Sequence, residues 1–170
     1  TADTSSGFRL YYNEGISLAR SLHDKPGEIR MLCAAGDHFA GRTKPDSAVL
    51  YYVKGLQLAR TSGLQQELIS SLWKAAKTYE DNSHFDRALP LYQEALKESR
   101  KRNDSKEIMI SLENLGAFFF YQNKDSAAVD CFNQQLHLVE QLGDSLEISQ
   151  CLNNIGLVYS KEGKYLKCIE

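Results

Sequence analysis

Several features are scarce in this 170-residue sequence, and each scarcity excludes a class of protein. Basic residues show no excess, since 20 Lys and Arg stand against 22 Asp and Glu, a net charge of −2. This balance argues against nucleic acid as the main partner, because phosphate binding normally requires a basic excess. Long apolar runs are missing too: the longest, residues 115–121, is far shorter than the ~20 residues of a membrane-spanning helix. We therefore expect no nucleic-acid partner and no membrane insertion of this segment.

Cysteine is scarce as well, and its pattern indicates packing. The four cysteines are Cys33, Cys131, Cys151 and Cys168. They form no C-x-x-C pair, and none stands at zinc-ligand spacing from a histidine. All four fall inside predicted helices, where a reduced cysteine behaves as a small apolar residue. We favour this interpretation over disulfides or reactive thiols, and the cysteines do not decide the compartment.

Motifs that carry catalytic or cofactor chemistry are missing. The four histidines are scattered through the chain: His23, His38, His84 and His137. None recurs beside a cysteine, serine or carboxylate that would position it for catalysis. No Gly-rich phosphate loop precedes a predicted helix, and the acidic residues do not follow the spacing of a calcium loop. We therefore predict no catalytic residue, no cofactor and no metal site, and we expect the protein not to be an enzyme.

One basic run has two interpretations. Its members are Lys97, Arg100, Lys101, Arg102 and Lys106. The run could bind an anion, but it ends a predicted helix, where the helix dipole favours cations. We favour the second interpretation.

The dominant feature of the sequence is an internal repeat of 40 residues without insertion or deletion. Equivalent positions carry the same leucine: Leu32, Leu72, Leu112 and Leu152. Four residues later each unit has a small residue: Gly36, Ala76, Gly116 and Gly156. A second series is aromatic: Tyr12, Tyr52, Tyr92 and Phe132. A period of this length predicts a repeat architecture, in which neighbouring units share one core.

Each unit is predicted to form two helices. Leu112, Leu115, Gly116 and Phe119 follow the i, i+3, i+4, i+7 spacing of one apolar helix face. Helix starts are predicted at Asp104 and Asp144, which are each followed three residues later by Glu. Helix ends are predicted at Gly63, Asn103 and Gly143, whose residue types favour the left-handed conformation. Pro26 and Pro45 are expected at helix starts, and Pro90 inside a helix that it should bend.

The repeat also predicts how the helices pack and where the units begin. Small residues such as Gly116 let the partner helix approach, and we expect Gly116 to face Ala128 in that helix. We expect a single solenoid over residues 1–170: the second helix of a partial repeat in 1–24, full repeats in 25–64, 65–104 and 105–144, and a truncated repeat in 145–170. The chain begins with Thr1 rather than Met, and we expect it to be a piece of a longer protein.

These residues resemble the tetratricopeptide repeat (TPR). The third unit matches its signature with Leu112, Leu115, Gly116, Phe119, Ala128 and Phe132. The fourth matches it with Leu152, Ile155, Gly156, Tyr159, Gly163 and Tyr165. The resemblance implies an all-α fold, a right-handed superhelical solenoid of antiparallel helix pairs. The 40-residue period is most similar to the repeats of bacterial sensor and regulatory proteins.

The resemblance also implies a binding site. In TPR proteins the first helix of each pair lines a concave groove, along which partner peptides lie. The residues placed there are Trp73, Lys74, Lys77, Glu113, Asn114, Phe120, Asn153 and Asn154, with Cys33 and Asp37 in the first full unit. Asn114 and Asn154 match the recurrent Asn of the family, whose amide can both donate to and accept from a peptide backbone; the alternative is that they only solvate the groove wall. Trp73 stands where chaperone-binding members have a Lys, so we do not expect chaperone tails as partners.

We predict a non-catalytic scaffold that binds a protein or an extended peptide within a signalling or regulatory protein. One alternative is a ligand- or peptide-sensing module that controls a fused kinase or DNA-binding domain. Another, less favoured, is an RNA-binding helical repeat, whose commonest members have a shorter period and a basic face. Self-association through exposed solenoid ends is a further expectation. The compartment is open between the cytoplasm, which we favour, and the periplasm.

The repeat makes a direct spectroscopic prediction. Far-ultraviolet circular dichroism should show helix for well over half of the residues and negligible strand, because the helical stripe recurs in every unit and no segment alternates with a period of two. A clear sheet signal would contradict the repeat interpretation.

Overall fold

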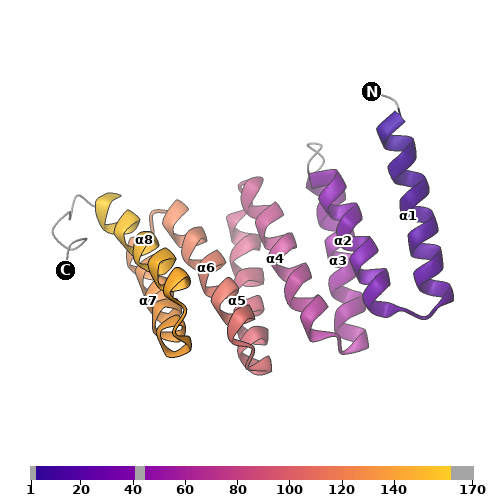
Figure 1. Ribbon diagram of the computed structural model, residues 1–170. Coiled ribbons are helices and arrows are strands. Elements are labelled where there is room, and N and C mark those ends of the chain that lie inside the picture. The colour runs from indigo at the N-terminus through magenta and orange to yellow at the C-terminus, as the bar shows by residue number, and fades with distance from the viewer. Residues whose placement is uncertain (1–2, 41–44, 162–170) are drawn as a thin grey trace. The chain divides into compact units, whose positions relative to one another are not determined.

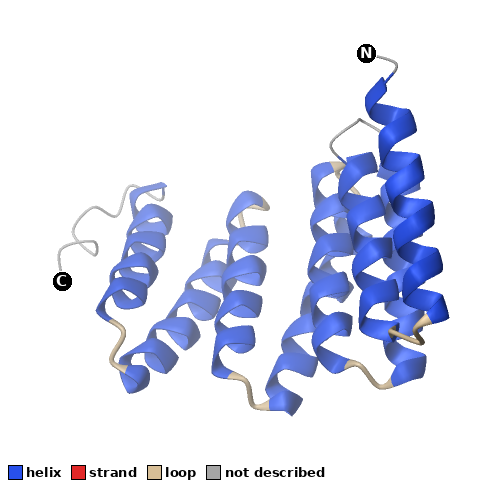
Figure 2. Cartoon of the chain, turned by 45° about the vertical axis from the view of Figure 1, so that its right-hand side comes forward, coloured by secondary structure: helices blue, strands red, loops and turns tan. Residues whose placement is uncertain are grey.

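The computed structural model describes residues 3–40 and 45–161, which form eight helices and no strand (Figures 1 and 2). The helices are α1 (Asp3–Ser21), α2 (Lys25–Ala40), α3 (Pro45–Ser62), α4 (Gln65–Asp81), α5 (Phe85–Arg102), α6 (Ser105–Tyr121), α7 (Asp125–Leu142) and α8 (Ser145–Lys161). The fold class is therefore all-α, as the sequence predicts. None of the described helices is both long and apolar enough to cross a membrane. The predicted positions Gly163, Tyr165 and Cys168 lie outside the described residues.

The chain divides into two compact units, Thr1–Leu91 and Tyr92–Glu170, and the boundary falls within α5. We call them the N-terminal unit and the C-terminal unit. In the N-terminal unit α1 packs on α2, α2 on α3 (the most extensive contact) and α3 on α4, and α2 also contacts α4. In the C-terminal unit α6 packs on α7 and α7 on α8. Short turns make consecutive helices antiparallel (Figure 1). Within each unit the helices are thus arranged as successive pairs.

Helix ends recur with the 40-residue period. His23, Gly63, Asn103 and Gly143 all have positive φ, from 56° to 71°. The predictions at Gly63, Asn103 and Gly143 are confirmed. His23 shows that the turn geometry is imposed by the packed helices even where the residue has a Cβ that opposes it, since non-glycine residues pay a steric cost at positive φ.

Aspartates begin several helices. The Asp104 carboxylate accepts a hydrogen bond from the backbone N–H of Glu107 at 3.1 Å, and the Asp144 carboxylate accepts one from Glu147 at 3.2 Å. Both predicted starts are confirmed. Asp24 does the same for Gly27 at 2.8 Å, at the helix start that was predicted from Pro26. These bonds satisfy backbone donors that have no partner within the helix.

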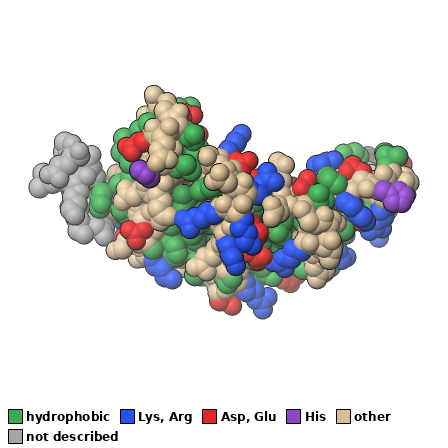
Figure 3. Space-filling view, turned by 90° about the horizontal axis from the view of Figure 1, so that it is seen from below, with side chains coloured by type: hydrophobic (Ala, Val, Ile, Leu, Met, Phe, Trp, Pro, Cys, Tyr) green, Lys and Arg blue, Asp and Glu red, His purple; other side chains and the backbone are tan. Residues whose placement is uncertain are grey.

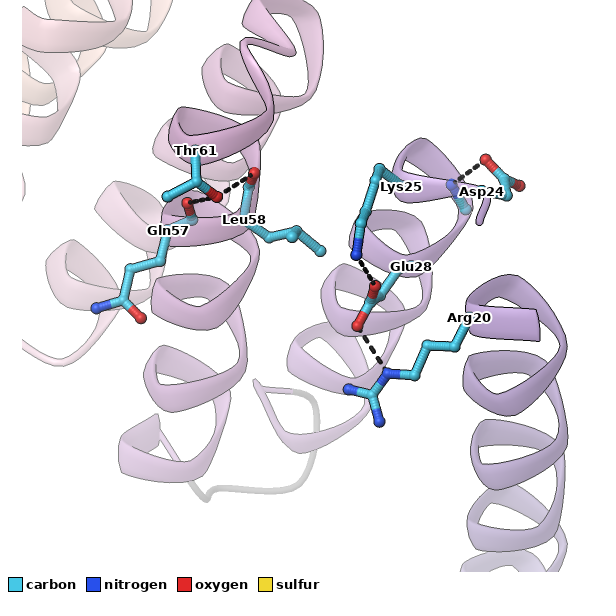
Figure 4. Close-up of polar contacts among 8 residues, drawn as sticks. Arg20, Asp24, Lys25, Glu28, Gln57, Leu58 and Thr61 are labelled. Atoms are coloured by element: carbon cyan, nitrogen blue, oxygen red, sulfur yellow. Dashed lines mark hydrogen bonds and ion pairs between the residues drawn. The ribbon is translucent and has the colours of Figure 1, made fainter. Parts of the chain in front are cut away.

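A buried carboxylate joins α1 to α2. Glu28 accepts a hydrogen bond from Arg20 at 2.8 Å and another from Lys25 at 3.2 Å (Figure 4). The bond from Arg20 lowers the pKa of Glu28, although burial acts to raise it. Arg102 and Glu107 form a similar pair across the α5–α6 turn at 2.8 Å. Ion pairs of this kind fix the turns between consecutive helices.

The close contact within a helix pair is made by an aromatic ring over a glycine. A Cβ added to Gly116 would lie 2.6 Å from the Phe132 ring, and one added to Gly36 would overlap the Tyr52 ring. The small residue is needed where the sequence analysis placed it. However, the nearest atoms to Gly116 belong to Phe132 and not to Ala128, because the large ring fills the space that the missing Cβ leaves.

The remaining sequence assignments concern proline and cysteine. Pro26 is the second residue of α2, Pro45 the first residue of α3, and Pro90 lies inside α5. Cys33, Cys131 and Cys151 are free and buried. Their role as packing residues is confirmed.

Gly116→Leu should lower the free energy of unfolding by roughly 1–3 kcal/mol, because the new side chain must displace the Phe132 ring. The matched control is Gly156→Leu, since a Cβ at Gly156 would meet no atom of the described residues within 4 Å. Both variants gain the same helix propensity, so their difference in thermal and urea unfolding, measured at low protein concentration, isolates the clash. Equal unfolding curves for the two variants would show that the ring does not depend on Gly116.

Candidate functional site

Two hollows lie between consecutive first helices. The α2/α4 groove in the N-terminal unit has a volume of about 410 Å³. Its walls are Ile29, Arg30, Cys33, Ala34 and Asp37 from α2 and Gln66, Glu67, Ser70 and Lys74 from α4. The α6/α8 hollow in the C-terminal unit has about 130 Å³. It is lined by Glu113, Ala117, Phe120 and Tyr121 from α6, Phe132 from α7, and Asn154 and Leu157 from α8.

A polar network organises the α2/α4 groove. The Lys74 ammonium lies 2.5 Å from one oxygen of Asp37, and the Tyr52 hydroxyl donates to the other oxygen at 2.7 Å. Burial and the Asp37 carboxylate raise the pKa of Tyr52, so its hydroxyl stays a donor. Arg30 and Glu67 add one charge of each sign to the walls. The groove therefore presents positive and negative groups side by side.

The α6/α8 hollow is more apolar and carries one perturbed carboxyl group. Burial, together with the nearby Glu147 carboxylate, raises the pKa of Glu113. Burial and the same acidic neighbours raise the pKa of Cys151 to about 11. Glu113 and Glu147 are 34 positions apart along the chain, on α6 and α8, so the fold brings their charges near each other.

Lys161 fixes the wall of this hollow. Its ammonium donates to the Phe120 carbonyl at 3.1 Å and to Asp125 at 3.2 Å. It also lies 4.6 Å from the centroid of the Phe120 ring, a cation–π distance. Lys161 thus holds the Phe120 ring in place.

The structure brings together some of the predicted site residues. Glu113, Phe120 and Asn154 line the α6/α8 hollow, and Lys74 lines the α2/α4 groove with Cys33 and Asp37. Asn114 and Trp73 are half-buried and Asn153 is exposed, but none of the three lines either hollow.

Lys77 also lies outside both hollows. Its exposed ammonium pairs with Asp81 at 3.0 Å and with Glu80 at 3.5 Å. Burial acts to lower its pKa, but these two carboxylates outweigh burial and raise it. The prediction that one continuous groove joins Trp73, Lys77, Asn114 and Asn154 spans both units and stays a prediction.

Several residues in the groove walls were not predicted from the sequence. Arg30, Gln66, Glu67 and Ser70 line the α2/α4 groove. The available signal was helical spacing: Glu67 and Ser70 precede Lys74 by seven and four positions, on the same helix face.

The basic run at the end of α5 is largely committed to bonds within the C-terminal unit. Arg100 donates to Gln134 at 2.7 Å, Lys101 to Glu98 at 2.6 Å, and Arg102 to Glu107 at 2.8 Å. Figure 3 views the molecule from below, where basic side chains in the middle of the face have acidic ones beside them. These bonds support the interpretation as a helix end over that as an anion patch. Among the described residues, no group of three or more His, Cys, Asp or Glu side chains is arranged to hold a metal ion.

Comparison with known proteins gives similarity at the level of structure. No family model and no curated protein sequence matches the chain. Solved structures do match the chain. BtubC (BKLC) from P. vanneervenii aligns with a TM-score of 0.81 and 20% identity, over 97% of this chain and 70% of that one. A putative kinesin light chain from P. anserina, with nearly identical TPR-like repeats, aligns with a TM-score of 0.77 and 13% identity over 98% and 82%.

A Rap protein complexed with competence and sporulation factor aligns with a TM-score of 0.75 and 18% identity, over 98% of this chain and 47% of that one. The chain thus spans less than half of this Rap protein. The chain has the TPR-like helical-repeat fold. This confirms the fold that the resemblance implied. At sequence identities of 13% to 20%, the structural similarity shows the fold and not the function.

The pKa of Glu113 provides a test of the hollow's geometry. In an NMR titration the Glu113 pKa should lie above the usual glutamate value of 4.5. The folded-state pKa is then higher than the unfolded-state pKa. The contribution of Glu113 to the free energy of unfolding is therefore fully present below pH 4.5 and is lost as the pH rises through the folded-state pKa. Glu147→Gln should lower the Glu113 pKa only in part, because burial is the larger cause. Glu140→Gln, at an exposed position on α7, is the matched control and should leave the Glu113 pKa unchanged. A Glu113 pKa at or below 4.5 in the parent would show that neither the desolvation of this carboxyl group nor the Glu147 charge acts as described.

Proposed function

We propose that this protein is a non-catalytic scaffold that binds a protein or an extended peptide along its first helices. The observation that carries the proposal is the position of the two hollows. Each lies between consecutive first helices, α2 and α4 or α6 and α8, where side chains of a bound segment can enter between neighbouring repeats.

The α6/α8 hollow has the chemistry of a pocket for one apolar side chain. Phe120, Phe132 and Leu157 form apolar walls, and a volume of about 130 Å³ suits a single side chain of moderate size. The Asn154 amide beside these walls can donate to a backbone carbonyl and accept from a backbone N–H. Glu113 adds a carboxylate, which favours a basic or N–H-bearing neighbour in the ligand.

The α2/α4 groove suits a longer, charged segment. Arg30 can pair with a ligand carboxylate, and Glu67 can pair with a ligand ammonium or guanidinium group. The Asp37 charge is paired with Lys74, and its other oxygen accepts from the Tyr52 hydroxyl, so its role is to hold the Lys74 side chain in place. A segment with charges of both signs therefore fits this groove better than a purely acidic or basic one.

A binding role also agrees with the state of the described cysteines. Burial raises the pKa of Cys33, and it raises those of Cys131 and Cys151 to about 11. Near neutral pH these thiols stay protonated, and a protonated thiol is a poor nucleophile.

We further propose that the segment belongs to a regulatory protein of the bacterial sensor type. The support is that a Rap protein with the same fold has been solved in complex with competence and sporulation factor. In the alternative that we retain, the bound ligand controls a kinase or DNA-binding domain fused to the repeats.

The binding proposal predicts the effect of removing two amides. A displayed library of random peptides would be selected on the 170-residue chain, and the selected peptide titrated by calorimetry. Asn114→Ala combined with Asn154→Ala should weaken binding roughly 5- to 100-fold, because each lost hydrogen bond is worth about 1 ± 0.5 kcal/mol. Thermal stability should stay nearly unchanged.

The two single variants show how much each amide contributes to the loss of affinity. Asn154→Ala should account for most of it, because Asn154 lines the α6/α8 hollow. Asn153→Ala is the matched control, since this exposed neighbour on the same helix lines neither hollow. Unchanged affinity of the double variant would place the ligand elsewhere on the protein, whereas a large loss of stability would assign the amides a structural role.

A further inference from the structure

Two further hollows in the C-terminal unit are formed with its second helices, α5 and α7. The first has a volume of about 590 Å³ and is lined by side chains of α5 and by Leu115 of α6. The second has about 450 Å³ and is lined by side chains of α5, α6 and α7. Arg100 lines both hollows, so they adjoin. We call the two together the second-helix groove, and each is larger than either hollow between first helices.

The floor of the second-helix groove is apolar. Leu96, Leu112 and Leu115 are at most 8% exposed, and Ile108 and Leu138 are half-buried. Ile108, Leu112 and Leu115 follow the i, i+4, i+7 spacing of one face of α6. At 1.5 Å per residue this face extends over about 10 Å. Two turns of a partner helix with large apolar residues at the same spacing would cover it.

The ionised side chains of the groove are all basic. Lys97, Arg100 and Lys101 line the first hollow, and among the described residues that line either hollow none is acidic. Lys101 is paired with Glu98 at 2.6 Å. Lys97 makes no side-chain hydrogen bond or ion pair within the described part of the chain. Arg100 donates to Gln134 at 2.7 Å, and this amide carries no charge. Two cations beside an apolar floor therefore have no counter-charge among the described residues.

We propose that the second-helix groove binds an acidic amphipathic helix of a partner protein. The apolar side chains of this helix enter the two hollows, and its carboxylates pair with Lys97 and Arg100. The helix dipole explains why cations end α5, but it does not explain an apolar floor beside them. A free anion would leave that floor exposed to water, whereas an amphipathic helix covers it. The groove is separate from the hollows of the proposed function, so neither proposal depends on the other.

Arg100 is the residue that has to change partner. Its hydrogen bond to Gln134 joins α5 to α7, and Arg100 lines both hollows. A carboxylate accepts stronger hydrogen bonds from a guanidinium than a neutral amide does, and it can accept two at once. On binding, Arg100 therefore exchanges the Gln134 oxygen for a ligand carboxylate. Gln134 is exposed, so its released amide is satisfied by water.

The test begins with a displayed library of helical peptides that have leucine at positions i, i+4 and i+7 and random residues elsewhere. The library is selected on the 170-residue chain, and peptides that bind a Lys97→Ala, Arg100→Ala double variant equally well are discarded. The remaining peptides should be enriched in Asp and Glu relative to the starting library. Replacing these acids by Asn and Gln, or the leucines by Gln, should each weaken binding roughly tenfold or more in fluorescence anisotropy.

Single variants of the protein measure each cation, with the tightest selected peptide as the probe. Arg100→Ala should weaken binding roughly 10- to 100-fold, because hydrogen bonds between charged groups are strong. Lys97→Ala should weaken it roughly two- to fivefold, as for a solvent-exposed ion pair. Lys106→Ala is the matched control, since it removes an exposed cation of the same basic run that lines neither hollow, and it should bind like the parent. All three side chains are exposed, and circular dichroism checks that each variant folds.

Two changes at Gln134 should act in different directions. Gln134→Ala frees Arg100 and should keep the affinity or raise it. Gln134→Glu places a competing carboxylate beside Arg100 and should weaken binding roughly fivefold or more. Asn154→Ala, in the α6/α8 hollow, should leave the affinity for this peptide unchanged.

Four results would overturn the inference. The first is a selection that yields no peptide dependent on Lys97 and Arg100, and the second is a set of dependent peptides without an excess of acids. The third is a peptide that binds as tightly without its leucines, because the surface would then recognise charge alone. The fourth is equal affinity of the two Gln134 variants. A peptide weakened by Asn154→Ala but not by Arg100→Ala would lie in the α6/α8 hollow, which overturns this inference and leaves the proposed function standing.

Discussion

The structure depends on one contact, an aromatic ring packed on a residue without a side chain. Tyr52 lies over Gly36 and Phe132 lies over Gly116, and in each case a single methyl group would not fit. Both members sit at fixed places in the 40-residue unit, so the same contact recurs in the α2/α3 and α6/α7 pairs. It holds together the helix pairs whose first helices, α2 and α6, line the two hollows.

The repeated backbone leaves the chemistry of each hollow to a few variable side chains. In the N-terminal unit the ring is Tyr52, and its hydroxyl donates to Asp37 across the helix pair. In the C-terminal unit the equivalent residues are Phe132 and Ala117, so neither the hydroxyl nor the carboxylate is present. The N-terminal unit thus has a hydroxyl–carboxylate pair at the two positions where the C-terminal unit has side chains that cannot form a hydrogen bond. One hollow is therefore polar and the other mainly apolar on the same framework.

The sequence pattern predicted the features that depend on neighbouring residues, such as helix starts and ends. It did not predict the features that depend on how the helices pack. The helix starts at Asp104 and Asp144 and the left-handed end at Gly63 could be predicted, because capping and positive φ are properties of short segments. The residue type of His23 gives no such signal, and only its place 40 positions before Gly63 indicates the left-handed conformation. Asn153 and Asn154 were both predicted for the binding groove; adjacent residues on a helix point in different directions, and of the two Asn154 lines the α6/α8 hollow, while the groove assignment itself stays a prediction.

The sequence by itself determined the all-α class, the helices, the repeat and the need for a small residue at Gly36 and Gly116, because a periodic pattern of apolar and small residues has one helical solution. Only the tertiary structure decided which side chains line the same hollow. It also decided that Phe132 rather than Ala128 contacts Gly116, and that the Glu147 charge acts on Glu113. These facts depend on distances through space between helices far apart along the chain. Such distances are set by how large side chains fill the gaps left by small ones, which a period in the sequence does not specify.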